Sequence, residues 1–81
     1  MTGIQAELVR LWGELLRVDT LSIEDSFLEL GGDSFFVVHV ASFVEAKYQV
    51  NIPLVEFFDY RTVALLAREI ERRARDEGRQ I

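Results

Sequence analysis

Residues 34–48 constrain the fold more than any other stretch, because they are long enough for a helix and apolar around most of its circumference. At three- and four-residue spacing, the stripe that we expect in the core comprises Val37, Val38, Ala41, Val44 and Tyr48. A second stripe comprises Phe36, Val40 and Phe43. A chain of 81 residues has few elements with which to surround such a helix. We therefore expect at least one of Phe35, Phe36 and Phe43 to be exposed and used in docking.

The periodicity predicts three further helices. Residues 2–17 are amphipathic, with Trp12 as a core anchor. Pro53 is tolerated in a first helical turn, so residues 54–58 are expected to form a short helix whose apolar side chains close the core. Thr62 is expected to cap the last helix, whose buried stripe comprises Val63, Leu66, Ala67, Ile70 and Ala74. The sequence thus predicts an all-α bundle of four helices with a short third helix.

Residues 18–33 lack helical periodicity and form a long loop between the first two helices, where Phe27 and Leu30 are expected to contact the core. A loop of this length usually has a function or local structure of its own. Within it, the triplet Asp25-Ser26-Phe27 repeats Asp33-Ser34-Phe35 without the preceding glycines. Only the second triplet precedes a long helix, so Ser26 is interpreted as a turn or capping residue.

Composition indicates one folded domain spanning residues 1–81, with residues from about 76 onward frayed. The sequence has no cysteine, so it offers no disulfide and no thiolate for zinc or for catalysis. Any thiol chemistry would therefore need an added cofactor. The chain shows no secretory signal and no stretch of membrane-spanning length, which makes a cytoplasmic location the default expectation.

The net charge of −5 is unevenly distributed. Residues 1–33 hold seven acidic and two basic side chains, and residues 19–33 hold five acidic side chains and no basic one. Nucleic-acid binding is disfavoured, because no basic face is available to neutralise phosphates. The acidic stretch is either a solvated loop or a docking surface for a basic partner.

The double glycine and the residues that follow it carry the candidate site. Gly31 and Gly32 permit positive φ and leave no side chain in the path of an approaching molecule. Asp33 is a good N-cap, which places the Ser34 hydroxyl at a helix start, beside unpaired backbone N–H groups and the positive end of the helix dipole. The sequence therefore predicts Ser34 as the attachment point of a phosphate-linked group.

A catalytic serine is a poor alternative. The single histidine, His39, follows Ser34 by five positions, which places it about 140° around the same helix and excludes a direct dyad. Phe36 stands where the Gly-x-Ser-x-Gly elbow has its closing glycine, and no lysine follows the glycines as in a nucleotide loop. His39 is instead expected at the surface, in contact with a partner.

Leu30-Gly31-Gly32-Asp33-Ser34, with the later segment 57–67, resembles the peptidyl carrier (thiolation) domains of nonribosomal peptide synthesis. The resemblance covers nearly the whole chain. It implies an acyl-carrier-like four-helix bundle with a short third helix, and a monomer. It further implies that Ser34, supported by Gly32 and Asp33, carries 4′-phosphopantetheine transferred from coenzyme A by a magnesium-dependent phosphopantetheinyl transferase.

The same resemblance implies a non-catalytic shuttle. The terminal thiol of the arm would hold an aminoacyl or peptidyl thioester, loaded by an adenylation enzyme and passed to a condensation, thioesterase or tailoring enzyme. Fatty-acid carriers generally have an acidic second helix and no double glycine, so amino-acid cargo is favoured over acyl cargo. A carrier of polyketide or aryl acids and an unmodified helical interaction domain remain open. We expect a free-standing carrier, and an excised synthetase domain is the alternative.

Three positions depart from the family pattern. Arg61 stands where a proline often precedes the threonine of the last helix, and Phe36 and Phe43 replace residues that are usually polar or basic. These two phenylalanines are seven positions apart and are expected on one face. Our hypothesis is that Phe35, Phe36, His39 and Phe43 form a docking face for a partner with an apolar groove. Lysine at positions 36 and 43 is then expected to preserve the fold and the modification.

Overall fold

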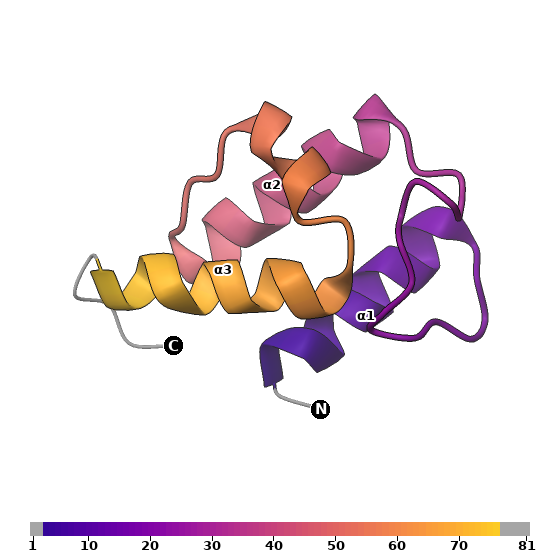
Figure 1. The fold of residues 1–81 in the computed structure, drawn as a ribbon, viewed down its shortest axis with the longest axis horizontal. Helices are drawn as coiled ribbons and strands as arrows, with labels where there is room; N and C mark the ends of the chain where they lie inside the picture. The colour runs from indigo at the N-terminus through magenta and orange to yellow at the C-terminus, as the bar shows by residue number, and fades with distance from the viewer. Residues whose placement is uncertain (1–2, 77–81) are drawn as a thin grey trace.

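The structure, a computed structural model, describes residues 3–76 and is entirely helical in its regular elements (Figure 1). The helices are α1 (Gly3–Leu16), α2 (Ser34–Tyr48), the 3₁₀ helix η1 (Leu54–Asp59) and α3 (Val63–Asp76). The all-α class, the four-helix order and the short third helix are confirmed. The expected fraying from about residue 76 falls almost wholly on residues 77–81, which lie outside the described residues.

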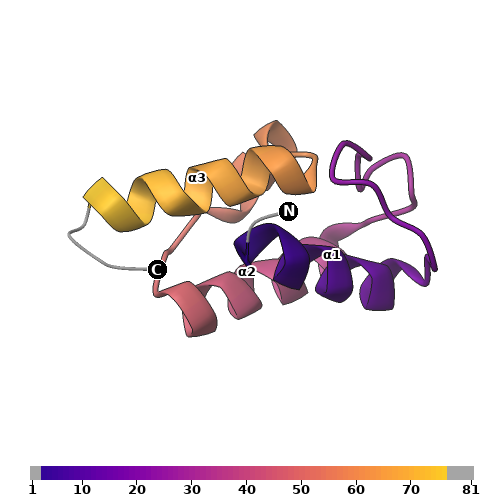
Figure 2. The same cartoon turned by 90° about the horizontal axis from the view of Figure 1, so that it is seen from below.

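The helices form two layers. Figure 2 shows α3 on one side of the bundle, with α1 and α2 on the other. α1 contacts both α2 and α3, and η1 packs against α2. No helix within residues 3–76 is long and apolar enough to cross a membrane.

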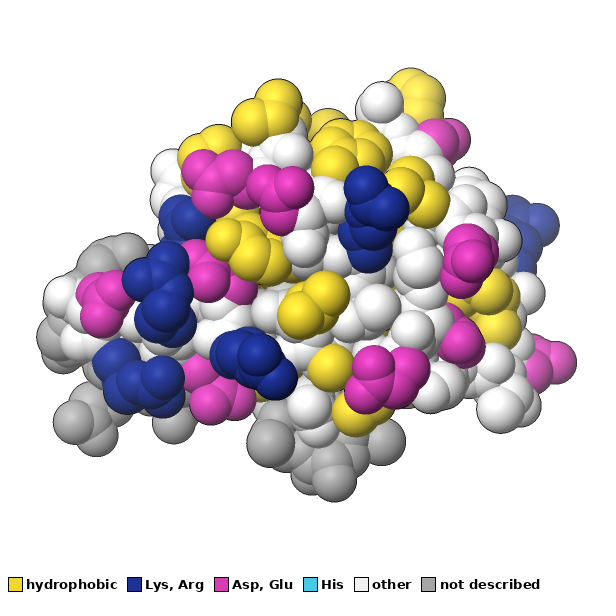
Figure 3. Space-filling model, viewed as in Figure 1, with side chains coloured by type: hydrophobic (Ala, Val, Ile, Leu, Met, Phe, Trp, Pro, Cys, Tyr) yellow, Lys and Arg dark blue, Asp and Glu magenta, His cyan; other side chains and the backbone are white. Residues whose placement is uncertain are grey.

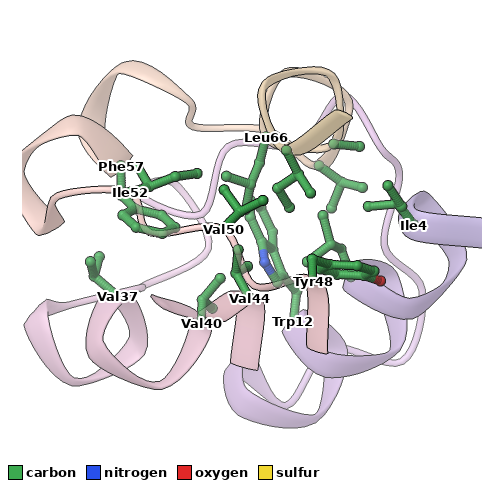
Figure 4. Packing of buried hydrophobic residues seen from close by; sticks show 14 of the residues in the cluster. Ile4, Trp12, Val37, Val40, Val44, Tyr48, Val50, Ile52, Phe57 and Leu66 are labelled. Carbon is green, nitrogen blue, oxygen red and sulfur yellow. The ribbon is translucent and has the colours of Figure 1, made fainter. Parts of the chain in front are cut away.

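Trp12 anchors the centre of the core, as its place on the α1 stripe predicts (Figure 4). Its side chain is 1% exposed and packs edge-on against Phe27 and Phe36, with ring centroids 5.8 and 5.2 Å away. The Phe27 and Phe36 rings stack on each other at 5.0 Å. Such aromatic pairs contribute about 0.5–1.5 kcal/mol each beyond the area that they bury. This aromatic cluster joins α1, the long loop and α2.

The buried face of α2 differs from the predicted one. Val38, expected in the core, is 45% exposed, whereas Phe36, expected at the surface, is 6% exposed. The buried residues of this helix are Phe36, Val37, Val40, Val44 and Tyr48. Consecutive residues of a helix point about 100° apart, so the two apolar stripes cover adjoining parts of the surface of α2. The packing of α1 and the long loop against the helix decides which of these side chains are buried.

The long loop is tied to the C-terminal half of the chain by backbone hydrogen bonds. The Phe27 amide donates to the Arg61 carbonyl and the Ala64 amide donates to the Ile23 carbonyl, each at 3.0 Å. Ser26 accepts a hydrogen bond from the Leu28 amide at 3.3 Å, so its predicted turn role is confirmed. Arg61, which stands where a proline was expected, donates from Nε to the Phe58 carbonyl at 2.6 Å and thereby ties down the end of η1.

Two groups of charged side chains join the helices. The Glu7 carboxylate on α1 accepts from the Tyr48 hydroxyl and pairs with Lys47, both at the end of α2. Burial, together with the adjacent Glu7 carboxylate, raises the pKa of Tyr48. On α3, Glu69 pairs with Arg72 and Arg73, and Arg73 reaches across to Glu56 on η1.

Acidification is expected to destabilise the protein through Glu69. Hydrogen bonds from Arg72, and secondarily from Arg73, lower the pKa of this carboxyl from 4.5 to about 2, although burial opposes the shift. A pKa that is lower in the folded state stabilises that state above pH 4.5, and the contribution is lost as the pH falls toward 2. We expect a loss of about 2 kcal/mol from Glu69 between pH 7 and pH 3. Urea unfolding at the two pH values measures it.

The matched variants are Glu69→Gln and Glu71→Gln. Glutamine at position 69 should lower the stability at pH 7 and flatten the pH dependence, because the titrating group is gone. Glu71 faces Arg75 at 3.9 Å, a long and exposed pair, so its replacement should leave the pH dependence almost unchanged. An equal acid sensitivity in wild type and Glu69→Gln would contradict the assignment.

Candidate functional site

Asp33 ends the long loop and caps α2. Its backbone is extended, and its Oδ1 accepts a hydrogen bond from the Phe36 amide at 3.1 Å. The capped helix therefore begins at Ser34, as predicted, and the side chain of Ser34 is exposed. Within residues 3–76 it forms no side-chain hydrogen bond. The hydroxyl is free to react at a helix N-terminus, where backbone N–H groups favour a negatively charged substituent.

Gly31 and Gly32 are each needed at their positions for a different structural reason. Gly31 has φ +93°, a left-handed conformation that side chains disfavour. Gly32 donates from its amide to the Phe27 carbonyl at 2.7 Å. A Cβ atom on Gly32 would lie 2.7 Å from Cδ1 and 2.9 Å from the carbonyl oxygen of Phe27. Gly32 thus lets the loop lie directly on the aromatic cluster below Ser34, a packing role in addition to the open approach that the sequence suggested.

Gly32→Ala is expected to destabilise the protein by about 1–3 kcal/mol, because the new methyl group overlaps the backbone and ring of Phe27. Chemical unfolding followed by circular dichroism measures the loss. Gly3→Ala is the control, since nothing lies within 4 Å of its Cβ position and alanine favours a helix. Equal midpoints for the two variants would contradict the packing role.

Phe35 and His39 lie where the sequence predicts them, exposed and near Ser34. Phe35 is 78% exposed, so the expectation that at least one of the three phenylalanines is exposed is confirmed. Both residues line a hollow of about 230 Å³ with the Gly31–Asp33 turn, and Leu15 and Leu16 of α1 close its other side. Phe36 also contributes to the lining, so the structure brings three of the four predicted docking residues to this hollow.

The other two predicted docking residues, Phe36 and Phe43, are less accessible than Phe35 and His39. The Phe36 side chain is only 6% exposed and packs among aromatic rings, so the expectation of an exposed side chain at this position is wrong. The reason is the position of the long loop, whose Phe27 covers the Phe36 ring. Phe43 is half-buried against the core and meets the Tyr48 ring edge-on at 6.1 Å. Lysine at both positions would disrupt packing rather than preserve the fold.

A set of exposed apolar side chains near the site was missed from the sequence. Val38 on α2 and the η1 residues Leu54, Val55 and Phe58 are exposed, and Figure 3 shows hydrophobic side chains on the surface over η1. The prediction that all apolar residues of 54–58 close the core is wrong, because Phe57 alone among them is buried. A helix of one to two turns buries only one side, so some of its apolar residues remain exposed.

The fold and the site together define an acyl-carrier-like helical domain that presents one serine hydroxyl at the start of its second helix. The sequence profile described as "Phosphopantetheine attachment site" matches residues 6–70. The chain belongs to this carrier family, whose members carry a covalently attached 4′-phosphopantetheine.

The proteins to which this chain is similar in sequence are much larger than the chain itself. The chain is 38% identical over 63 residues to part of tyrocidine synthase 3 of Brevibacillus parabrevis, which covers 78% of this chain and 1% of that protein. It is 38% identical over 81 residues to part of nonribosomal peptide synthetase ecdA of Aspergillus rugulosus, covering 98% of this chain and 1% of that protein. A segment of polyketide synthase PksN of Bacillus subtilis (strain 168) is 31% identical over 70 residues, covering 86% of this chain and 1% of that protein.

Among solved structures, the chain is similar to one in the complex of the phosphopantetheine transferase Sfp with coenzyme A and a peptidyl carrier protein. The TM-score is 0.83 at 30% identity, over 90% of this chain and 95% of that chain. A second similar structure is McyG A-PCP complexed with phenylalanyl-adenylate, with a TM-score of 0.80 and 31% identity over 86% of this chain and 11% of that chain. The resemblance to peptidyl carrier domains is thus confirmed by sequence and by fold.

Proposed function

We propose that this chain is a peptidyl carrier in which Ser34 bears 4′-phosphopantetheine and the thiol of that arm holds an aminoacyl or peptidyl thioester. The observation that carries the proposal is the position of Ser34. It is exposed, it is the first residue of α2, and the Asp33 cap and the Gly31-Gly32 turn hold it there. The absence of cysteine from the sequence agrees, since the reactive sulfur must come from the arm.

The modification is a phosphoryl-group transfer from coenzyme A. The Ser34 oxygen bonds to the phosphorus next to pantetheine, the bond from that phosphorus to the bridging pyrophosphate oxygen breaks, and adenosine 3′,5′-bisphosphate leaves. His39 lies five residues further along α2, about 140° around the helix from Ser34, and is too far away to accept the serine proton. The proton therefore passes to a base of the transferase. The resulting phosphodiester carries one negative charge. Such a charge at the N-terminus of a helix is stabilised by about 0.3–1 kcal/mol.

The chain itself is proposed to be non-catalytic, in the cytoplasm, where coenzyme A is available. Its partners would be a phosphopantetheinyl transferase, an adenylation enzyme, and a condensation, thioesterase or tailoring enzyme. Similar chains occur in structures with Sfp and with an adenylate-bound A-PCP protein, which supports the first two. For docking we propose Phe35 and His39, extended by the exposed Val38, with Phe43 contributing only its solvent-facing edge.

Amino-acid cargo is favoured because the similar chains include a peptidyl carrier protein and a segment of a nonribosomal peptide synthetase, and because α2 contains a single acidic residue, Glu45. An acyl carrier of a polyketide pathway is the second candidate, favoured by the match to PksN. Loading assays distinguish them. A peptidyl carrier accepts an aminoacyl group from an adenylation enzyme, and a polyketide carrier accepts an acyl group from an acyltransferase.

The proposal is tested by incubating the protein with coenzyme A, magnesium and a broad-specificity phosphopantetheinyl transferase. Intact-mass measurement is expected to show a gain of one phosphopantetheine per chain. A protein that stays at its original mass, while a known carrier is converted in the same reaction, would overturn the proposal.

A further inference from the structure

Phe27 belongs to the long loop, and its ring lies where three helices meet. The ring is buried, with 1% of the side chain exposed. Its centroid lies 5.8 Å from that of Trp12 on α1, 5.0 Å from that of Phe36 on α2 and 5.9 Å from that of Phe58 on η1. Because a core is packed as densely as an organic crystal, a ring held from three sides has little freedom to shift. Phe27 is therefore a fixed point within a segment that has no regular structure.

The backbone of Phe27 is bonded in two directions. Its amide donates to the Arg61 carbonyl, in the connection between η1 and α3, at 3.0 Å. Its carbonyl accepts from the Gly32 amide at 2.7 Å. The adjacent residues Ser26 and Thr62 form an isolated antiparallel β-bridge between the same two segments. Phe27 thus connects the start of α3 to the turn that precedes the attachment serine.

The position of the Ser34 oxygen follows the backbone on either side of it. The Ser34 side chain is exposed and forms no side-chain hydrogen bond within residues 3–76. On the helical side, the Asp33 cap and the first turn of α2 hold the backbone. On the other side, the turn is held by the bond from Gly32 to Phe27. A shift of Phe27 would therefore move the turn and, with it, the serine hydroxyl.

We propose that Phe27 is a positioning residue for phosphopantetheinylation, holding the Gly31-Gly32 turn so that the Ser34 oxygen reaches the phosphorus of coenzyme A in line. The inference rests on the proposed function, because it concerns the rate of that modification. The serine oxygen must approach the phosphorus opposite the pyrophosphate oxygen that leaves. A misplacement of about 1 Å can slow a step of this kind about 100-fold. Phe27 is buried, so it acts through the turn.

The proposal predicts a split between binding and rate. Docking is assigned to exposed side chains such as Phe35, which do not depend on the turn for their exposure. We expect Phe27→Leu to lower the maximal single-turnover rate of modification by about 10- to 100-fold. The transferase concentration that gives half of this rate should change by less than about threefold. The assay follows intact mass over time, with coenzyme A, magnesium and an excess of a broad-specificity phosphopantetheinyl transferase.

Val44→Ala is the control for a weakened core. Val44 is 0% exposed and lies toward the far end of α2, the helix that begins with Ser34. Its truncation opens a cavity and lowers stability, but it leaves the bonds of Phe27 in place. The maximal rate for Val44→Ala should therefore equal that of the wild type. Both variants are assayed where circular dichroism shows them to be folded.

Amide hydrogen exchange measures the turn itself. In Phe27→Leu, exchange of the Gly32 amide should accelerate by about tenfold or more relative to that of Leu66, whose amide donates to the Thr62 carbonyl in α3. In Val44→Ala the ratio of the two exchange rates should match that of the wild type. An effect on stability alone would accelerate both amides together, so the ratio separates positioning from a general loss of stability.

Phe58→Leu decides the matter if Phe27→Leu does not fold. Phe58 is 39% exposed, so its replacement is tolerated, and it removes one of the three rings around Phe27. Its maximal rate should fall by about two- to fivefold. An unchanged rate in Phe58→Leu would then overturn the proposal.

With a folded Phe27→Leu, the proposal is overturned by a maximal rate equal to that of Val44→Ala. A decrease that appears only in the transferase concentration at half-maximal rate would overturn it equally, because Phe27 would then act on docking. A wild-type protein that gains no mass, while a known carrier is converted in the same reaction, would instead overturn the proposed function.

Discussion

Phe36→Lys is expected to unfold the protein. The Phe36 side chain is 6% exposed, stacks on Phe27 with ring centroids 5.0 Å apart and meets the edge of Trp12 at 5.2 Å. Truncating a buried phenylalanine costs about 3–5 kcal/mol, and an unpaired charge in the same place costs more. A small domain has about 5–10 kcal/mol of stability in total. Circular dichroism and urea unfolding should show little remaining helix or a transition at very low urea.

The neighbouring residue supplies the control. Phe35 is 78% exposed, and Phe35→Lys makes the same chemical change one position away. We expect it to keep the helical spectrum and to shift the stability by no more than about 0.5 kcal/mol. A Phe36→Lys protein as stable as Phe35→Lys would show that the aromatic cluster does not stabilise the fold.

Ser34→Ala is expected to abolish phosphopantetheinylation completely, because no other oxygen takes the place of the exposed hydroxyl at the start of α2. The variant should remain folded, since the Ser34 side chain makes no hydrogen bond within the described residues and Asp33 still caps the helix. Intact-mass measurement after incubation with coenzyme A and a transferase should show the unmodified mass alone. Circular dichroism should show the spectrum of the wild type.

Ser26→Ala is the matched variant, because Ser26 lies in the same Asp-Ser-Phe triplet but is half-buried in a turn. Phosphopantetheinylation of the Ser26→Ala protein should proceed to the same extent as that of the wild type. Modification of Ser34→Ala, or loss of modification in a folded Ser26→Ala, would show that the attachment point has been misassigned.

Local signals in the sequence predicted much of the site. Asp33 is a strong capping residue after two glycines, so the start of α2 at Ser34 depends on three adjacent residues and needs no distant contact. The end of the same helix was also predicted correctly from its pattern. Its C-cap is Gln49, with φ +57°, a conformation that glutamine seldom adopts and that its residue type does not signal.

Distant contacts account for the errors. Phe36 and Val38 were assigned to the wrong environments because the two apolar stripes of α2 differ by one position. The aromatic residue that covers Phe36 comes from a loop without periodicity. That loop is itself ordered by bonds from Phe27 to Arg61 and from Ala64 to Ile23, which join residues more than thirty positions apart. The short third helix contains too few residues for its pattern to indicate which side is buried, and the exposure of Val55 was missed for that reason.

Locating the added mass within the chain tests the central claim most directly. After modification by the transferase, the protein is digested and the peptides are fragmented in a mass spectrometer by a method that keeps the phosphodiester intact. We predict a single phosphopantetheine, on Ser34. Attachment to Ser22, Ser26 or Ser42 instead, with Ser34 unmodified, would contradict the account, because the capped helix start would then have no part in the chemistry.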